Sequence, residues 1–118
     1  NKGLEGVCFN SKNNRLYLVN EYKPKELLKL SKKNKNISEA YGLKFGDDIS
    51  GICYDKKRNV FWILSDESQS VYQTSVQGEK LKKFKIPVVK PEGVVLDEKC
   101  EKLYIVSDDS SELFVFQL

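Results

Sequence analysis

The sequence contains no histidine, only three cysteines and no hydrophobic run long enough to cross a bilayer. Without histidine, these residues cannot build a Ser-His-Asp or Cys-His catalytic arrangement. Cys8, Cys53 and Cys100 are an odd number without CxxC spacing, so a zinc site is not expected. A membrane span needs ~20 consecutive apolar residues. We therefore expect no membrane span in this segment.

Excess charge of one sign is also small. The 118 residues carry a formal net charge of only +3, although 31% of them are charged. The densest basic run, 29–35, has no interleaved aromatic residue that could stack on a base, so we expect a polar loop and no nucleic acid as a partner. No secretory signal opens the chain at Asn1. The start falls inside a repeat motif, and we expect a processed or shortened chain.

An internal repeat organises the sequence. Three segments align without gaps: LEGVCFNSKNNRLYLVNE from Leu4, ISGICYDKKRNVFWILSD from Ile49 and PEGVVLDEKCEKLYIVSD from Pro91. Their glycines lie 45 and then 42 residues apart, at Gly6, Gly51 and Gly93. This period is typical of four-stranded propeller blades.

Each repeat predicts a first strand around its glycine, a turn and a strongly apolar second strand. The second strands are expected at 16–19, 61–64 and 103–106, and the third strands at 26–30, 70–75 and 112–117. Fourth strands are expected at 41–45 and 81–86. Near-continuous hydrophobicity in the second strands indicates that both of their faces are covered, as in stacked blades.

These patterns predict an all-β fold. We expect three four-stranded β-propeller blades, half of a six-bladed ring, within the single segment 1–118, with repeats at approximately 1–46, 47–89 and 90–118 and the last blade lacking its fourth strand. Such an arc leaves two apolar end faces and one unpaired strand edge. Either the missing propeller half or a second copy of the chain is expected to cover them.

Several recurring residues have structural explanations. Cys8 and Cys53 hold equivalent places next to the repeat glycine, where we expect core thiols. We expect turn formers after the first strands, at Asn10, Asp55 and Asp97. The most apolar strands carry an aromatic series that we expect to pack between blades, at Tyr17, Trp62 and Tyr104.

Polar residues also recur, and these are the candidate site. Glu5, Ser50 and Glu92 each precede the repeat glycine, at the start of the first, innermost strand. In a propeller this end of the strand borders the central channel. A second acidic series follows the second strands at Glu21, Asp66 and Asp108. Converging carboxylates are hard oxygen ligands of the kind that Ca²⁺ or Mg²⁺ prefers. The alternative is that these side chains cap loops and accept backbone hydrogen bonds.

We assign the candidate residues accordingly. Candidate metal ligands, with calcium as the possible cofactor, are Glu5, Glu92, Asp48 and Glu21. Other channel candidates are Ser50, Asp66 and Asp108. No catalytic residue is assigned.

The strings NKGLEGVCFNSKNNRLYLVNEYKP, DISGICYDKKRNVFWILSDESQSVY and PEGVVLDEKCEKLYIVSDDSSELFVF resemble the closing half of the SdiA-regulated family. The resemblance covers nearly the whole chain and implies a six-bladed propeller. It also implies a bacterial cell-envelope protein, periplasmic or membrane-anchored through an N-terminal segment, without a defined activity. The sequence departs from the family pattern at Ser107-Asp108-Asp109, where Ser-Glu-Pro is more usual.

Two functions are compatible with these observations. The first is a non-enzymatic propeller module of the envelope that binds a protein, glycan or small ligand across its channel face. The second is a calcium-dependent hydrolase of phosphoester or lactone type, with carboxylate ligands at the channel. The absence of histidine favours the first.

Overall fold

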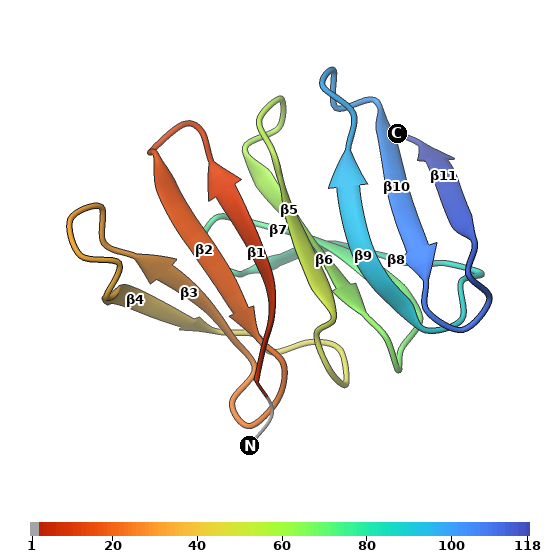
Figure 1. The fold of residues 1–118 in the computed structure, drawn as a ribbon, viewed down its shortest axis with the longest axis horizontal. Coiled ribbons are helices and arrows are strands. Elements are labelled where there is room, and N and C mark those ends of the chain that lie inside the picture. The colour runs from red at the N-terminus through yellow and green to blue at the C-terminus, as the bar shows by residue number, and fades with distance from the viewer. Residues whose placement is uncertain (1–2) are drawn as a thin grey trace.

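The computed structural model describes residues 3–118, which form eleven strands in three antiparallel sheets (Figure 1). The first sheet has the order β1 (Leu4–Asn10), β2 (Arg15–Asn20), β3 (Glu26–Leu30) and β4 (Ile37–Gly42). The second has β5 (Gly51–Asp55), β6 (Val60–Ser65), β7 (Ser70–Thr74) and β8 (Lys80–Lys85). The third has β9 (Pro91–Leu96), β10 (Lys102–Ser107) and β11 (Leu113–Gln117). Each sheet is a meander of consecutive strands, as in a propeller blade.

The turns after the first strands form as predicted. Asn10 Oδ1 accepts a hydrogen bond from the backbone N–H of Lys12 at 2.9 Å, and Asp55 Oδ1 accepts one from that of Arg58, also at 2.9 Å. Asp97 accepts two such bonds at 2.8 and 2.9 Å. These side chains replace backbone partners that the tight turns cannot supply.

The fourth strand of the first sheet was predicted wrongly at 41–45, since β4 spans Ile37–Gly42. The apolar residues that suggested a strand, Leu43 and Phe45, are buried in the connection to the second sheet. Phe45 stacks on Tyr72 with ring centroids 4.4 Å apart. The outer strand itself is mostly exposed and therefore needs few apolar residues.

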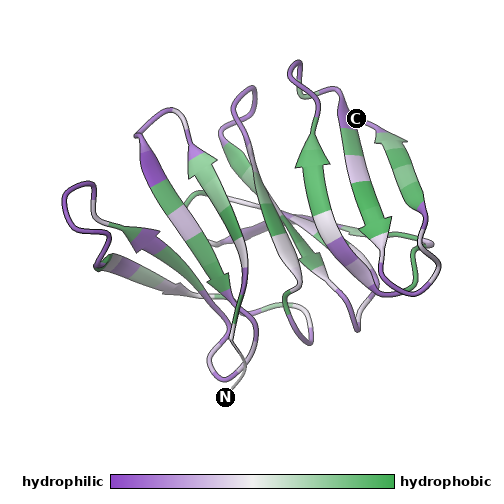
Figure 2. Ribbon diagram, viewed as in Figure 1, coloured by the Kyte–Doolittle hydropathy of each residue, from purple (hydrophilic) through white to green (hydrophobic). Residues whose placement is uncertain are grey.

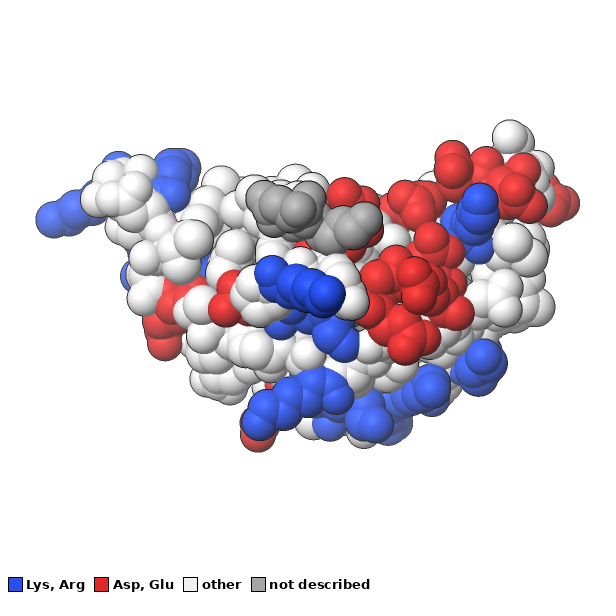
Figure 3. Space-filling model, turned by 90° about the horizontal axis from the view of Figure 1, so that it is seen from below, with Lys and Arg blue, Asp and Glu red and all other residues white. Residues whose placement is uncertain are grey.

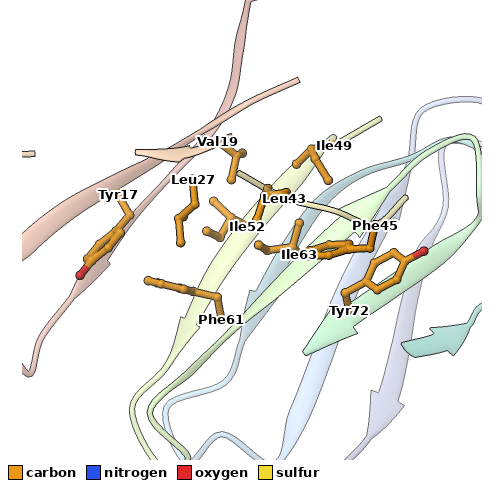
Figure 4. Close-up of a cluster of buried hydrophobic side chains, with 10 residues drawn as sticks. All are labelled: Tyr17, Val19, Leu27, Leu43, Phe45, Ile49, Ile52, Phe61, Ile63 and Tyr72. Atoms are coloured by element: carbon orange, nitrogen blue, oxygen red, sulfur yellow. The ribbon is translucent and has the colours of Figure 1, made fainter. Parts of the chain in front are cut away.

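The first hydrophobic core lies between the first and second sheets (Figure 4). Tyr17 of β2 meets Phe61 of β6 there, with ring centroids 4.8 Å apart. A second core lies between the second and third sheets, where Trp62 is buried against side chains of β10 such as Leu103. Interblade packing is therefore confirmed for Tyr17 and Trp62. Figure 2 shows that hydrophobic residues are concentrated in the strands and hydrophilic residues in most of the loops.

The first strands of the three sheets, β1, β5 and β9, approach one another closely. A Cβ added at Gly6 would lie 3.2 Å from Ile52 Cγ2, and one at Gly51 would lie 3.4 Å from the Glu92 carbonyl oxygen. The absence of a side chain at Gly6 and Gly51 therefore permits this close approach of neighbouring sheets.

The cysteines are free thiols that belong to the packing. Cys53 is buried in the second core, and Cys8 packs against the first. Burial raises the pKa of the Cys8 thiol to about 12. In residues 3–118 no helix is long and apolar enough to cross a bilayer.

Candidate functional site

The candidate carboxylates come from two kinds of strand end that meet at one edge of each sheet. First and second strands are antiparallel, so the start of one lies beside the end of the other. Leu4 at the start of β1 pairs with Asn20 at the end of β2, and Pro91 of β9 pairs with Ser107 of β10. The acidic residues that precede the repeat glycines and those that follow the second strands are thereby brought together.

β-bulges place two of these carboxylates. The register of β1 on β2 shifts between Leu4 and Gly6, which leaves Glu5 without a direct cross-strand partner. The same irregularity leaves Glu92 unpaired between Pro91 and Gly93 in the third sheet. A bulge inserts one residue into a strand and redirects its side chain, and bulges are over-represented next to functional sites.

Six carboxylates gather at this end of the inner strands, which we call the acidic end. Its members are Glu5, Glu21, Asp48, Asp66, Glu92 and Asp108. Figure 3 shows a dense group of Asp and Glu side chains on the face seen from below Figure 1. The two recurring acidic series of the sequence contain five of the six, and Asp48, which immediately precedes the second repeat, belongs to neither.

The electrostatics of Glu92 report this crowding. Partial desolvation raises the pKa of the Glu92 carboxyl, and the negative charges of Asp66, Glu5, Asp108 and Asp48 raise it further. Like charges disfavour ionisation because each added charge repels the others. Glu92 therefore lies among carboxylates drawn from all three sheets.

Asp66 shows the same effect with one opposing charge. Desolvation and then the neighbouring Asp48 raise the pKa of the Asp66 carboxyl, and Lys90 partly offsets this. Asp108 and Glu21 add smaller contributions in the raising direction. Among the described residues, Lys90 is the one cation that lowers the pKa of Asp66. No sequence pattern had pointed to it.

Two of the candidate side chains have local structural partners. Asp48 Oδ1 accepts a hydrogen bond from the backbone N–H of Glu67 at 3.0 Å, which fixes it over the turn after β6. Ser50 is buried, and its hydroxyl donates to the carbonyl oxygen of Pro91 at 2.6 Å. Ser50 therefore ties the second sheet to the third.

The carboxylate oxygens of the acidic end are ligands that suit a hard cation, but the side chains lie too far apart to bind one ion together. Within residues 3–118 no three His, Cys, Asp or Glu side chains stand close enough to hold one metal ion. Ligation by several of them therefore requires side-chain movement. The arrangement as it stands favours an approaching positive charge, which would relieve the mutual repulsion.

The structure also contains a groove that was not predicted from the sequence. A groove of about 520 Å³ lies between the second and third sheets, and its walls include Trp62, Phe84 and Phe116. Trp62 and Phe84 have ring centroids 5.9 Å apart. Arg58, Lys82 and Lys85 add positive charge to the lining. The sequence feature that could have indicated this groove is Phe84, an aromatic residue within the lysine-rich strand β8.

A family model described as SdiA-regulated matches residues 1–117. Solved structures with similar folds include hydrazine synthase of Kuenenia stuttgartiensis, with a TM-score of 0.77 and 12% identity over 98% of this chain and 33% of that one. A gluconolactonase from Xanthomonas campestris has a TM-score of 0.76 and 17% identity over 98% of this chain and 37% of its own.

A luciferin-regenerating enzyme has a TM-score of 0.70 and 20% identity over 93% of this chain and 40% of its own. All three similarities concern the fold alone. The chain spans 33 to 40% of the length of these propeller-like proteins.

Proposed function

We propose a function that starts from the family: this chain belongs to the SdiA-regulated family. In this proposal it is part of a propeller module whose acidic end binds a positively charged ligand. The ligand is a protein, glycan or small molecule that brings either its own cationic group or a bridging divalent cation. We place the module in the bacterial cell envelope, periplasmic or membrane-anchored, because the resemblance of its motifs to that family points there.

One observation carries the binding proposal. Glu92 and Asp66 have raised pKa values because both carboxyls are partly desolvated and lie among other carboxylates of the acidic end. Such repulsion destabilises the free protein, and a bound cation would remove it. Perturbed carboxylates gathered at a strand end are more typical of a binding site than of a solvated surface.

Thermal melting with added Ca²⁺ tests the proposal. A ligand that binds only the folded state stabilises it by ~2.7 kcal/mol at a concentration one hundred times Kd. We expect Ca²⁺ to raise the Tm relative to chelator by more than NaCl of equal ionic strength, because screening alone acts equally in both salts. Spermidine tests a cationic organic ligand in the same assay.

Substitutions locate the effect. Glu92→Gln should reduce the Ca²⁺-induced shift, whereas Glu98→Gln, beyond the opposite end of β9, should leave it unchanged. If neither Ca²⁺ nor spermidine exceeds matched NaCl, the acidic end is not a cation-binding site and the proposal fails.

A calcium-dependent hydrolase of phosphoester or lactone type is the second candidate. The observation that favours it is the pair of raised pKa values at Asp66 and Glu92, since a carboxyl with a raised pKa retains a proton closer to neutral pH. A bound divalent cation would supply Lewis-acid polarisation of the ester oxygen. Calcium-dependent turnover of a chromogenic phosphodiester or lactone, lost in Asp66→Asn, would support it.

A further inference from the structure

The outer strand of the second sheet, β8, has a free edge. Among the described strands it pairs with β7 alone. The two faces of the second sheet pack against the first and third sheets through the two hydrophobic cores (Figure 1). Strands pair within the plane of a sheet, whereas other sheets stack on its faces. The free edge of β8 therefore points away from both neighbouring sheets and is open whatever stacks on the two faces.

Two residues of β8 direct their backbone groups to this edge. The N–H of Ile86, just beyond β8, donates to the carbonyl oxygen of Gln69 at 3.0 Å, on the side of β7. Along an antiparallel pair the direction of the backbone N–H and C=O groups alternates from one residue to the next. Because the register is regular along this part of β8, Phe84 also directs its backbone groups to β7, and Lys83 and Lys85 direct theirs to the free edge.

The same strand concentrates positive charge. All six residues of β8 are exposed, and four of them are lysines, Lys80, Lys82, Lys83 and Lys85. Residues two apart in a strand are separated by ~7 Å, which is within the Debye length of ~8 Å at physiological ionic strength. The ammonium groups therefore repel one another. None of the four forms a salt bridge within residues 3–118, so an anionic partner would relieve this repulsion.

The equivalent strand of the first sheet does not carry such charge. β4 is also an outer strand and is mostly exposed, but its one charged residue is Glu39. Lys29 of β3 neutralises Glu39 through a salt bridge of 3.1 Å. A position at the outer edge of a blade therefore does not by itself require lysines. The lysines of β8 are a feature of the second sheet alone among these two outer strands.

We propose that β8 docks an extended acidic segment of another protein, which adds to the four-stranded second sheet as a fifth strand. In this mode of recognition main-chain hydrogen bonds supply affinity and alternate side chains supply specificity. The segment pairs with the backbone of Lys83 and Lys85 and places its carboxylates opposite the lysines. An aliphatic residue of the segment covers Phe84, which is 43% exposed. This docking involves no residue of the acidic end and does not rest on the proposed cation binding.

An anionic membrane surface would also attract lysines, but the geometry of β8 favours a strand. Lys82 and Lys83 are adjacent, and adjacent residues of a strand point to opposite faces of the sheet. A flat membrane surface reaches one of these faces, whereas a strand added at the edge presents side chains to both. Lipid headgroups also do not supply the alternating donors and acceptors that the backbone of Lys83 and Lys85 would pair with.

A short peptide tests the docking. The acetylated and amidated peptide TEVEET, in antiparallel register, places its carboxylates opposite Lys82, Lys83 and Lys85 and its valine opposite Phe84. In a ¹⁵N NMR titration of the 118-residue chain, it should bind at least tenfold more tightly than the uncharged peptide TQVQQT. At saturation, hydrogen exchange at the amides of Lys83 and Lys85 should slow at least fivefold, because both become hydrogen-bonded.

A modified peptide separates strand pairing from simple charge attraction. N-methylation of the second and fourth residues of TEVEET keeps all three carboxylates but removes the two N–H groups that would face β8. This change should weaken binding at least tenfold. Vesicles that contain phosphatidylserine provide the comparison with a membrane surface.

Substitutions locate the site. Lys83→Glu combined with Lys85→Glu should lower the affinity for TEVEET at least tenfold. The matched control is Lys32→Glu combined with Lys33→Glu, which changes the net charge equally at two exposed residues between β3 and β4 and should leave the affinity unchanged. Lys83→Pro should also abolish binding, and it is compatible with the fold because an edge strand tolerates proline where the N–H faces solvent. Circular dichroism establishes that each variant is folded.

Several results would overturn the proposal. TEVEET would fail to bind at millimolar concentration, or TQVQQT or the N-methylated peptide would bind as tightly as TEVEET. An equal loss of affinity in the control variant would show that net charge alone attracts the peptide. Binding to phosphatidylserine vesicles without binding of TEVEET would assign β8 to a membrane surface instead.

Discussion

At the residue scale, Asp55 forms a turn and also takes part in hydrogen bonds that link the second sheet to the third. Its side chain is fully buried and accepts hydrogen bonds from Trp62 Nε1 at 3.0 Å and Arg58 Nη1 at 2.8 Å. The same Arg58 nitrogen reaches the carbonyl oxygen of Cys100 at 2.8 Å, in the third sheet's first turn. Burial by itself would raise the pKa of Asp55, but the hydrogen bonds from Trp62 and Arg58 outweigh it and lower the pKa.

Asp55→Asn should destabilise the fold by ~1–3 kcal/mol at pH 7, because it leaves Arg58 without its charged partner. A carboxyl with a lowered folded-state pKa stabilises the protein above its unfolded pKa, and that contribution is lost as the pH falls toward the folded value. Urea unfolding should therefore show a gap between the two proteins at pH 7 that narrows below ~pH 4. The exposed Asp47→Asn serves as the control, and an equal loss there would refute the assignment.

At the element scale, the sheets are held together where their first strands approach. A Cβ added at Gly6 of β1 would have three atoms within 3.3 Å, two of them from Ile52 of β5. Any side chain here would press β1 away from β5. The outer strand β8 is an open sheet edge, where unpaired backbone groups could pair with another chain. Charged side chains on an edge strand oppose such aggregation, and β8 carries Lys80, Lys82, Lys83 and Lys85.

Gly6→Ala should cost ~1–3 kcal/mol of stability through overpacking. Gly42→Ala in β4 is the matched control, because a Cβ there meets nothing within 4 Å. That change should be neutral or stabilising by up to ~1 kcal/mol, since alanine has less conformational freedom in the unfolded chain. Denaturant melts of the two variants check the difference, and equal stabilities would show that β1 can move away from β5 without cost.

At the scale of the whole molecule, charge is separated rather than mixed. The carboxylates of the acidic end come from three sheets, whereas a row of lysines lies along the outer strand β8. Figure 3 shows acidic and basic side chains in separate regions of one face. A small net charge of +3 therefore conceals a locally negative surface that the composition could not reveal.

Glu92→Gln should raise the Tm at pH 7 in chelator. A carboxyl whose folded-state pKa is raised contributes stability below its unfolded pKa and loses it as the pH rises through the folded value. The advantage of the glutamine variant should therefore disappear below ~pH 4, where the wild-type carboxyl is protonated in both states. A calorimetric pH series checks this, and a variant that is less stable than wild type at pH 7 would mean that Glu92 makes a structural contact instead.

Features that depend on spacing along the chain could be predicted before the structure was known. The repeat period located the three sheets, alternation and apolar runs located the first and second strands, and Asn10, Asp55 and Asp97 marked the turns. The sequence also placed five of the six carboxylates of the acidic end in two recurring series, because antiparallel pairing sets the starts of the first strands beside the ends of the second strands.

Features that depend on contacts between residues far apart in the sequence could not be predicted in this way. Leu43 and Phe45 are apolar because the next sheet covers them, so a local pattern could not distinguish their connection from a strand. The bulges at Glu5 and Glu92 arise from register between strands. The hydroxyl of Ser50 donates a hydrogen bond to the carbonyl oxygen of Pro91, 41 residues away in the sequence. The burial of Ser50 therefore depends on the packing of the second sheet against the third.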